Sequence, residues 1–548
     1  MLATEGVRRP VWRDPIVAVA VTIILVVELV VVWRALPRAL DHDEGEHLRA
    51  AAWVASGKTL YRDFAENHTP FLYMILAPFT PATGQGAGPA HASNEIAATR
   101  HFAMVARALS AIAGIAAVIC IAACARHLAG DAMAVLPVLA ALLASSWTWL
   151  RGVADVRSEP YTLLLFWAGA FLVVRASAAS RRALMAAGVG IGLIAVADLW
   201  NPKWPLESLV MLGLYAAYLR KEATRVSPVA SPAEFAEPSI GASAAVPGNI
   251  AGEAAGATRA VSILASLSFA GLLPLVALCV ALRLTTLHDL VFFSFTYASA
   301  VSRWYRGAVA ATSAGAFAFC PSWLAPWGAV IAAAVVIGVS WLRRRGNILL
   351  VFLLTGAASL EVVLLYPYPH LWPQYLVMWA CVVALLYGVT IAAVARQPRV
   401  RAVVAAIIVI GFAAHEWPRL MQNVDERHWQ TMSDLQHRLG PGEAAWVRPE
   451  ELPIAAPAGS YYWYAFADQV PFSLAYSQTA AARGFLPLLR DEDLPPCRIL
   501  AGIDTMHVRL LDSRAVRNLP ASKRCMEELA RRGSLRRIDG TPIWEVTR

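Results

Sequence analysis

Residues 16–53 read IVAVAVTIILVVELVVVWRALPRALDHDEGEHLRAAAW. Residues 16–36 are almost all apolar, and a membrane-spanning helix needs roughly 20 such residues. The run is too long for the apolar core of a signal peptide, so we expect a retained anchor. A dense cluster of carboxylates and histidines, residues 41–47, follows directly. This stretch predicts a membrane protein with polar chemistry at the mouth of its first span.

The composition of the whole chain indicates many spans. Of its 548 residues, 58% are hydrophobic and 16% are charged, and the mean hydropathy is +0.52. Soluble domains are typically about 45–50% apolar and about 25% charged. We therefore predict an α-helical polytopic membrane protein with about eleven transmembrane helices. The expected spans are residues 16–36, 102–125, 132–150, 158–175, 183–199, 204–219, 261–282, 322–342, 348–366, 374–395 and 402–417.

The basic residues lie in alternate loops, which predicts the orientation. With the N-terminus inside, every inner connection contains arginine, as the positive-inside rule requires. This topology accounts for the net charge of +9, so nucleic acid is not expected as a partner. The residues are Arg126, Arg175, Arg181, Arg182, Arg220, Lys221, Arg225, Arg343, Arg344, Arg345, Arg396, Arg399 and Arg401.

The predicted domain boundary falls near residue 417. Residues 1–417 form the membrane domain, with an inner linker at 226–260 whose Ala, Pro, Ser and Gly content carries no folding signal. An odd number of spans leaves residues 418–548 outside as a small extracytoplasmic α/β domain. We expect strands at 444–447, 498–503 and 542–546, and helices at 426–439 and 521–532. Cys497 and Cys525 lie in this domain and could pair or stay as free thiols.

The first outer loop, residues 37–101, holds the densest polar cluster. Acids at the mouth of a helix bundle suit acid–base chemistry. The cluster could equally be a solvated helix start, with Asp41 or Asp43 as the N-cap. A divalent metal could bind His42, Asp43 and His47, but their spacing matches no specific metal motif, and we assign no metal ligand.

Later outer turns add further ionisable groups at the same depth. They include Arg157 and Glu159, then Lys203, then His370. Each turn could be only an aromatic belt with a snorkelling cation. Together, however, they supply the cations and carboxylates that a site needs to bind a lipid-linked phosphate and deprotonate a hydroxyl group.

The pattern of residues 41–70 resembles the first outer loop of bacterial GT-C glycosyltransferases. These are the relatives of protein O-mannosyltransferases and of the lipid A aminoarabinose transferase. The resemblance rests on Asp41 to His47, Ala51 to Trp53, Gly57, Tyr61 to Phe64 and His68 to Pro70. The turns at 157–159, 201–203 and 368–370 fall where that family has its later polar positions. The resemblance covers roughly residues 15–400.

The resemblance implies a GT-C fold and a role for each polar residue. Asp43 would be the general base, with Glu44 as its rival or helper. Glu159 would be a second acid that orients the acceptor or the base. Residues implied to bind substrate, chiefly the departing phosphate, are Arg157, Lys203, His370 and His68.

The implied reaction transfers a sugar from a polyprenyl-phosphate donor to an extracytoplasmic glycan, lipid or protein acceptor, with inversion at the anomeric carbon. The implied location is the bacterial cytoplasmic (inner) membrane, with the active site facing outside. A multi-span transporter or lipid flippase is the alternative, but it would show ionisable groups near the midplane and repeated halves. An oligosaccharyltransferase-like enzyme is disfavoured because its tail motif, Trp-Trp-Asp-Tyr-Gly, is absent from the sequence. A non-catalytic scaffold is a further alternative, because the tail domain could bind cell-wall material.

Overall fold

The structure is a computed structural model, and it describes most but not all of the chain. The predicted span 322–342 and most of span 348–366 lie outside the described residues. The described residues are 14–66, 68–81, 89–144, 155–176, 181–201, 205–224, 248–309, 350, 353–358, 360, 377–421, 426–440, 442–454, 470–488, 490–505 and 507–547.

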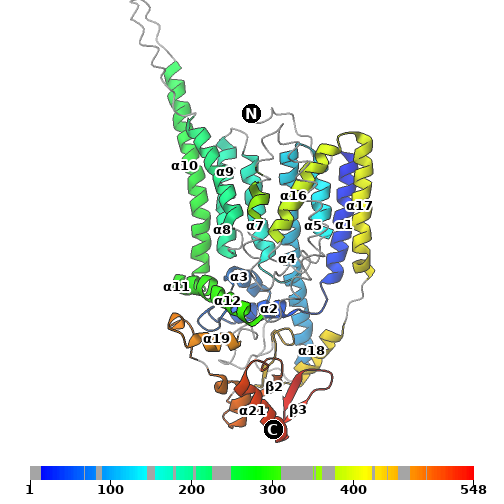
Figure 1. The fold of residues 1–548 in the computed structure, drawn as a ribbon, viewed down its shortest axis with the longest axis vertical. Helices are drawn as coiled ribbons and strands as arrows, with labels where there is room; N and C mark the ends of the chain where they lie inside the picture. The colour runs from blue at the N-terminus through cyan, green and yellow to red at the C-terminus, as the bar shows by residue number, and fades with distance from the viewer. Residues whose placement is uncertain are drawn as a thin grey trace, which may run out of the picture.

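Long helices run side by side to form a bundle, as Figure 1 shows. Nine of the predicted spans coincide with described helices. These are α1 (Pro15–Ala35), α4 (Pro89–Ala129), α5 (Val135–Ala144), α7 (Glu159–Arg175), α8 (Arg181–Trp200), α9 (Pro205–Thr224), α10 (Gly248–Ala281), α16 (Val377–Val394) and α17 (Pro398–Met421).

The surface of this bundle is apolar, as lipid requires. Among the described residues, six helices are long and apolar enough to cross a membrane. Leu264 on α10 and Ile407 on α17 are each 64% exposed, and in water such rows of bare aliphatic side chains would be costly. The chain is therefore a helical polytopic membrane protein, as predicted.

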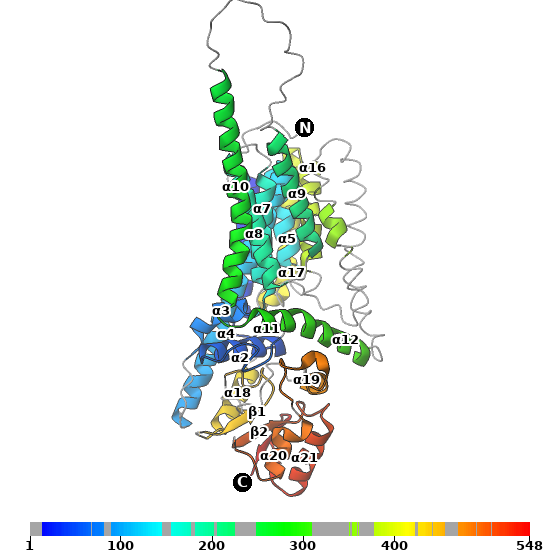
Figure 2. The same ribbon diagram turned by 90° about the vertical axis from the view of Figure 1, so that its left-hand side faces the viewer.

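Shorter elements lie across one end of the bundle, between it and the C-terminal residues (Figures 1 and 2). We call this end the tail side; α1 begins at the opposite end (Figure 1). Tyr61 stacks on Phe293 with ring centroids 4.7 Å apart, which ties the first loop to this layer. The elements are α2 (His42–Ala55), α3 (Phe71–Leu76), η2 (Ala77–Phe79), α11 (Leu287–Val291), η5 (Phe292–Tyr297) and α12 (Ala298–Val309).

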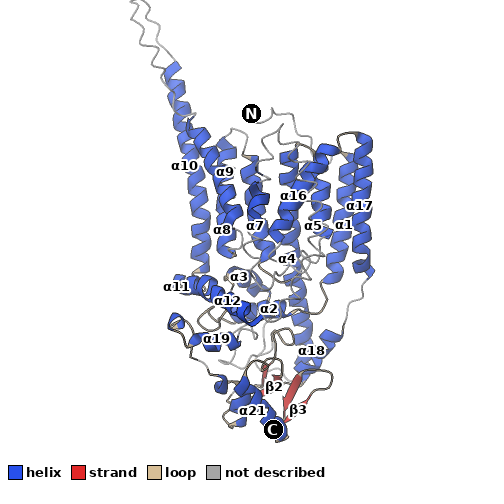
Figure 3. Ribbon diagram, in the orientation of Figure 1, coloured by secondary structure: helices blue, strands red, loops and turns tan. Residues whose placement is uncertain are grey.

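The C-terminal residues form a small helix-and-sheet unit, and the described strands gather there (Figure 3). The sheet order is β1-β2-β4-β3, with β1 parallel to β2 and the other pairs antiparallel. The elements are α18 (Arg427–His437), β1 (Ala444–Trp446), α19 (Val470–Ser477), η10 (Ala480–Ala482), η11 (Asp491–Asp493), α20 (Pro495–Leu500), β2 (Val508–Asp512), α21 (Pro520–Arg531), β3 (Leu535–Arg537) and β4 (Ile543–Val546). Both predicted helices of the tail, and its strands near 445 and 544, are confirmed.

Two predictions about these regions were wrong. Residues 498–503 are not a strand, because Pro495 and Pro496 occupy the first helical positions of α20 and proline is preorganised for that place. The predicted linker 226–260 does not extend to residue 260, since α10 already begins at Gly248. The open question about the two tail cysteines is resolved, because Cys497 and Cys525 form a disulfide.

The C-terminal unit packs directly on α2. Arg49 of α2 donates to the carbonyl of Leu452 over 3.0 Å. A Cβ atom placed on Gly45 would lie 2.5 Å from the backbone nitrogen of Glu450, which is closer than real Cβ contacts allow. Glycine at position 45 therefore permits residues 449–450 to touch the backbone of α2.

We predict that Gly45→Ala weakens this contact by about 1–3 kcal/mol, the usual cost of overpacking. The tail of the purified protein should then be cleaved faster by a protease, and its thermal midpoint should fall. Gly213→Ala on α9 is the matched control, because a Cβ there meets nothing within 4 Å. Equal proteolysis of the Gly45 and Gly213 variants would contradict the packing described.

Candidate active site

The first turn of α2 is fixed by a capping box. The Asp41 side chain accepts a hydrogen bond from the backbone N–H of Glu44 (3.0 Å), and the Glu44 carboxylate accepts one from the N–H of Asp41 (3.1 Å). Both bonds satisfy backbone donors that a helix start leaves unpaired. The reading of Asp41 as an N-cap is thus confirmed, while the next acid, Asp43, points elsewhere.

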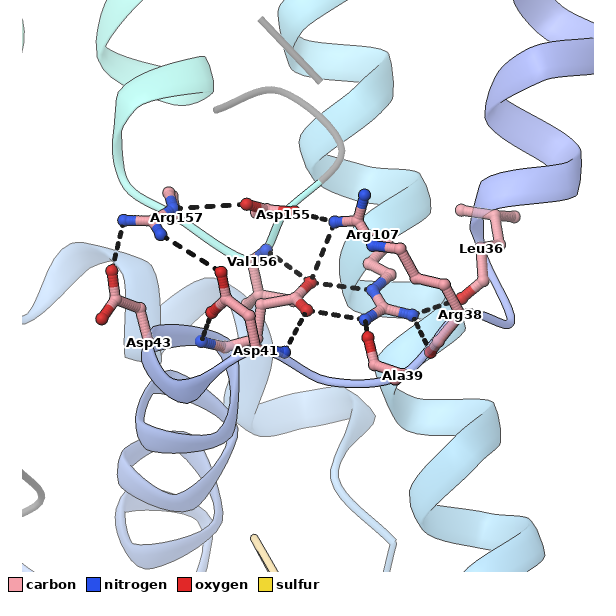
Figure 4. Close-up of polar contacts among 10 residues, drawn as sticks. Leu36, Arg38, Ala39, Asp41, Asp43, Arg107, Asp155, Val156 and Arg157 are labelled. Atoms are coloured by element: carbon pink, nitrogen blue, oxygen red, sulfur yellow. Dashed lines mark hydrogen bonds and ion pairs between the residues drawn. The ribbon is translucent and has the colours of Figure 1, made fainter. Parts of the chain in front are cut away.

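Arg107 of α4 binds the Glu44 side chain at this helix start. Its guanidinium binds both oxygens of Glu44, at 2.8 and 2.6 Å, and both side chains are fully buried. The remaining donors reach the carbonyls of Leu36, Arg38 and Ala39 at 2.6–2.9 Å (Figure 4). Burial raises the pKa of Glu44, but Arg107 outweighs it and lowers that pKa to about 2. Glu44 is therefore a closed, ionised anchor.

The turn before α7 also contacts the Glu44 carboxylate. The backbone N–H of Val156 donates to Glu44 over 3.3 Å, and Asp155 forms an ion pair with Arg38. These contacts place Arg157 directly above the first turn of α2 (Figure 4). Two segments that are more than 100 residues apart in sequence are thus held together around one buried carboxylate.

Arg157 forms its shortest contact with Asp43, 2.6 Å between Nη1 and Oδ2. It also lies 3.5 Å from Asp41 and 3.6 Å from Asp155, so one cation serves three carboxylates. Burial opposes ionisation of Asp43, yet Arg157, His47 and His42 together outweigh it and lower the pKa of Asp43. The side chain of Asp43 is 35% exposed, against 12% for Arg157. This Asp43–Arg157 pair is accessible, unlike the Glu44–Arg107 anchor beneath it.

His42 occupies the opposite side of the same turn. Its ring contacts Glu46 at 2.7 Å and Glu450 of the tail at 2.8 Å. Burial disfavours the charged ring, but the two carboxylates raise the pKa of His42 to about 11. The pKa of Glu450 falls to about 2 because His42 outweighs its burial, whereas burial raises that of Glu46. The charged pair is therefore His42 and Glu450, and it joins α2 to the tail.

A second cluster lies one helical turn beyond Asp43. The side chains of His47, Glu66 and His68 place ligand atoms within 4.8 Å of one another. His47 contacts the hydroxyl of Tyr73 at 3.2 Å, and His68 contacts Glu66 at 2.9 Å. Burial, followed by the nearby His68, lowers the pKa of His47 to about 3, so its imidazole is neutral.

Of the comparisons with known proteins, only the one with solved structures finds matches. No family model matches the chain, and a search of curated proteins finds no match. Over nearly its whole length the chain is similar in structure to ArnT. The solved structure is that of ArnT from Cupriavidus metallidurans bound to undecaprenyl phosphate; it is 14% identical, the TM-score is 0.45, and the match covers 98% of this chain and 97% of that one.

The structure brings together some of the predicted site residues and leaves others undescribed. Asp43 and Arg157 are in contact, and the charge of Glu159 at the start of α7 acts on Arg157. Glu159 itself is buried beside Ser158. His68 belongs to the neighbouring cluster with His47. Lys203 and His370 lie outside the described residues.

Two interpretations of the first loop change. Glu44, expected as a rival or helper base, is closed off by Arg107 and is not accessible for proton transfer. The metal set of His42, Asp43 and His47 does not form, because His42 and Asp43 bind Glu450 and Arg157 instead.

Several residues of this site were missed in the sequence, and one had left a signal. Arg107 lies within the apolar run 102–125, and an arginine inside a span is expensive unless it is paired. That cost could have identified Arg107 as the partner of an acid. Arg38, Glu66 and Tyr73 had no such signal, since only folding brings them to α2.

The His42–Glu450 pair predicts how stability depends on pH. The folded pKa of His42 is raised from 6.5, so its contribution is complete below pH 6.5 and is lost as pH rises toward about 11. That of Glu450 is lowered from 4.5, so its contribution is lost as pH falls from 4.5 toward about 2. His42→Gln should destabilise the protein by about 1–3 kcal/mol near pH 6. The difference from wild type should shrink toward about pH 9.

Thermal unfolding in detergent across this range measures the effect. His101→Gln, at an exposed position of α4, is the control. A difference between His42→Gln and wild type that stays constant from pH 6 to about 9 would contradict the charged pair.

Proposed function

We propose that the chain is a membrane glycosyltransferase of the GT-C type that takes a sugar from a polyprenyl-phosphate donor. The single observation that carries the proposal is the accessible Asp43–Arg157 pair at the tail side of the bundle. A carboxylate and a cation in contact at the membrane edge supply both a proton acceptor and a binding group for a lipid-linked phosphate.

The geometry supports a division of roles between the two side chains. Arg157 is permanently charged, and its fork-shaped guanidinium suits phosphate oxygens. An arriving phosphate would share Arg157 with Asp43 and loosen the 2.6 Å contact, leaving the Asp43 carboxylate to face the acceptor hydroxyl. The phosphate of the donor is already a good leaving group, so positioning and charge neutralisation supply most of the catalysis.

In the proposed step, the acceptor oxygen attacks the anomeric carbon as the bond from that carbon to the phosphate oxygen breaks. The electron pair of the breaking bond leaves with the polyprenyl phosphate, whose charge Arg157 neutralises. The hydroxyl proton passes to Asp43. Because Asp43 has a low pKa, it accepts this proton only as the new C–O bond forms. Attack from the face opposite the phosphate inverts the anomeric carbon.

The remaining predicted residues keep proposed roles. Glu159 is proposed to orient Arg157, because its charge acts on the guanidinium from the start of α7. Lys203 and His370 are proposed to bind the departing phosphate, and His68 is proposed to lie on the substrate side of the cluster around His47. The tail side is proposed to face outward, so donor and acceptor would meet in the extracytoplasmic space.

We predict that Asp43→Asn lowers the rate of sugar transfer by about 10²–10⁴-fold, the usual contribution of a general base. Membranes containing the variant are incubated with a panel of radiolabelled undecaprenyl-phosphate sugars, and labelled product is counted. Binding of undecaprenyl phosphate itself should change little, because Arg157 remains.

Asp434→Asn is the matched control, since Asp434 is an exposed carboxylate on α18. It should transfer sugar at the wild-type rate. Transfer by Asp43→Asn at the wild-type rate would remove Asp43 as the base. If wild type moves the labelled lipid between leaflets without forming product, the transporter or flippase alternative gains support.

A further inference from the structure

Three potential metal ligands from two segments meet beside the active site. His47 comes from α2, whereas Glu66 and His68 come from the loop that leads to α3. His47 and Glu66 are 2% and 1% exposed, and the side chain of His68 is 26% exposed. The cluster is therefore mostly buried but reaches the surface through His68.

The spacing of the ligand atoms fits a small metal ion. In a tetrahedral zinc site, nitrogen and oxygen ligands lie about 2.0–2.1 Å from the metal, so two ligands are about 3.3 Å apart. Here His68 and Glu66 are 2.9 Å apart, and all the ligand atoms fall within 4.8 Å of one another. Small side-chain rotations would bring the three groups to that separation.

The chain also contains the outer partner that metal-binding histidines usually have. The hydroxyl of Tyr73 contacts Nδ1 of His47 at 3.2 Å and fixes the orientation of the ring. Such second contacts are typical around metal-binding imidazoles. The rings of His47 and His68 meet edge to face at 79°, with centroids 4.9 Å apart, so they do not stack on each other.

We propose that His47, Glu66 and His68 bind one divalent transition-metal ion of the zinc class, with its fourth position open to a substrate oxygen. Two imidazoles and one carboxylate suit zinc or cobalt better than magnesium or calcium, which prefer oxygen ligands. A set of two histidines and one glutamate is also a known catalytic zinc set that leaves a position for water or substrate.

The His47, Glu66 and His68 triad lies where a bound ion could assist the proposed reaction. His47 lies one helical turn from Asp43, and the two side chains influence each other electrostatically. An ion there would add positive charge next to the Asp43–Arg157 pair, where the anionic donor is proposed to bind. This role rests on the proposed function, whereas metal binding itself does not.

Metal binding is tested on the full chain in detergent, stripped with a chelator and then exposed to Zn²⁺ or Co²⁺. Elemental analysis should find about one equivalent of Zn²⁺ per chain, and Co²⁺ should give the visible absorption of a tetrahedral site. Glu66→Gln and His68→Gln should each weaken binding by at least about tenfold. His415→Gln should bind as wild type does, because the His415–Glu416 pair has no third ligand group among the described residues.

A second measurement does not depend on how the variants fold. X-ray absorption at the zinc edge of the loaded wild type should show two imidazole ligands and light-atom distances of about 2.0–2.1 Å. Failure of the stripped wild type to take up metal, or wild-type affinity in both Glu66→Gln and His68→Gln, would overturn the proposal and leave a hydrogen-bonded packing cluster.

The outcomes for the metal and for sugar transfer can be told apart. Asp43→Asn should still bind about one equivalent of Zn²⁺ per chain even though its transfer rate falls. A protein that binds metal but transfers no sugar would keep the metal site and refute the proposed function. A protein that transfers sugar without taking up metal would refute the metal site and keep the proposed function.

Discussion

The buried ion pair between Arg107 and Glu44 is the interaction on which the site depends. The guanidinium of Arg107 also binds the backbone carbonyls that follow α1, so this one side chain joins α1, α4 and α2. Removing one member of a buried pair typically costs about 3–5 kcal/mol, because the other charge is left without a partner. Here the loss would also release the turn at Val156, which hydrogen-bonds to the same carboxylate. The anchor thus controls where Arg157 and Asp43 lie.

The layering of charges explains how a site can be rigid and accessible at once. Glu44 and Arg107 have no exposure, whereas Asp43 lies one residue earlier and is partly open. Neighbouring residues on a helix point in different directions, so α2 presents one acid to its anchor and another to the surface. The tail also holds α2 in place, because its residues 449–452 contact His42, Gly45 and Arg49. Rigid positioning of this kind is what a reaction governed by orientation and charge requires.

Much of the fold could be predicted because lipid imposes a simple rule. Apolar runs of about 20 residues, separated by basic loops, predict spans and their order. The tail was harder, because strands such as β2 and β3 are short and carry little pattern. In the site, the Asp43–Arg157 contact agrees with one part of the prediction that the polar turns meet in one pocket, and Lys203 lies outside the described residues. The burial of Glu44 could not be predicted from the sequence, because Asp43 and Glu44 are adjacent carboxylates. Only the folded chain places Arg107 and the backbone of Val156 against Glu44. The triad with Glu66 likewise exists only after the loop folds back on α2.

The most direct test of the central claim is a cryo-electron microscopy structure of the full chain with undecaprenyl phosphate bound. The phosphate should lie at the tail side, with an oxygen about 2.7–2.9 Å from the guanidinium of Arg157 and with Asp43 beside it. The Glu44–Arg107 pair should remain closed. A phosphate bound at the opposite end of the bundle, with Asp43 still paired to Arg157, would contradict the account.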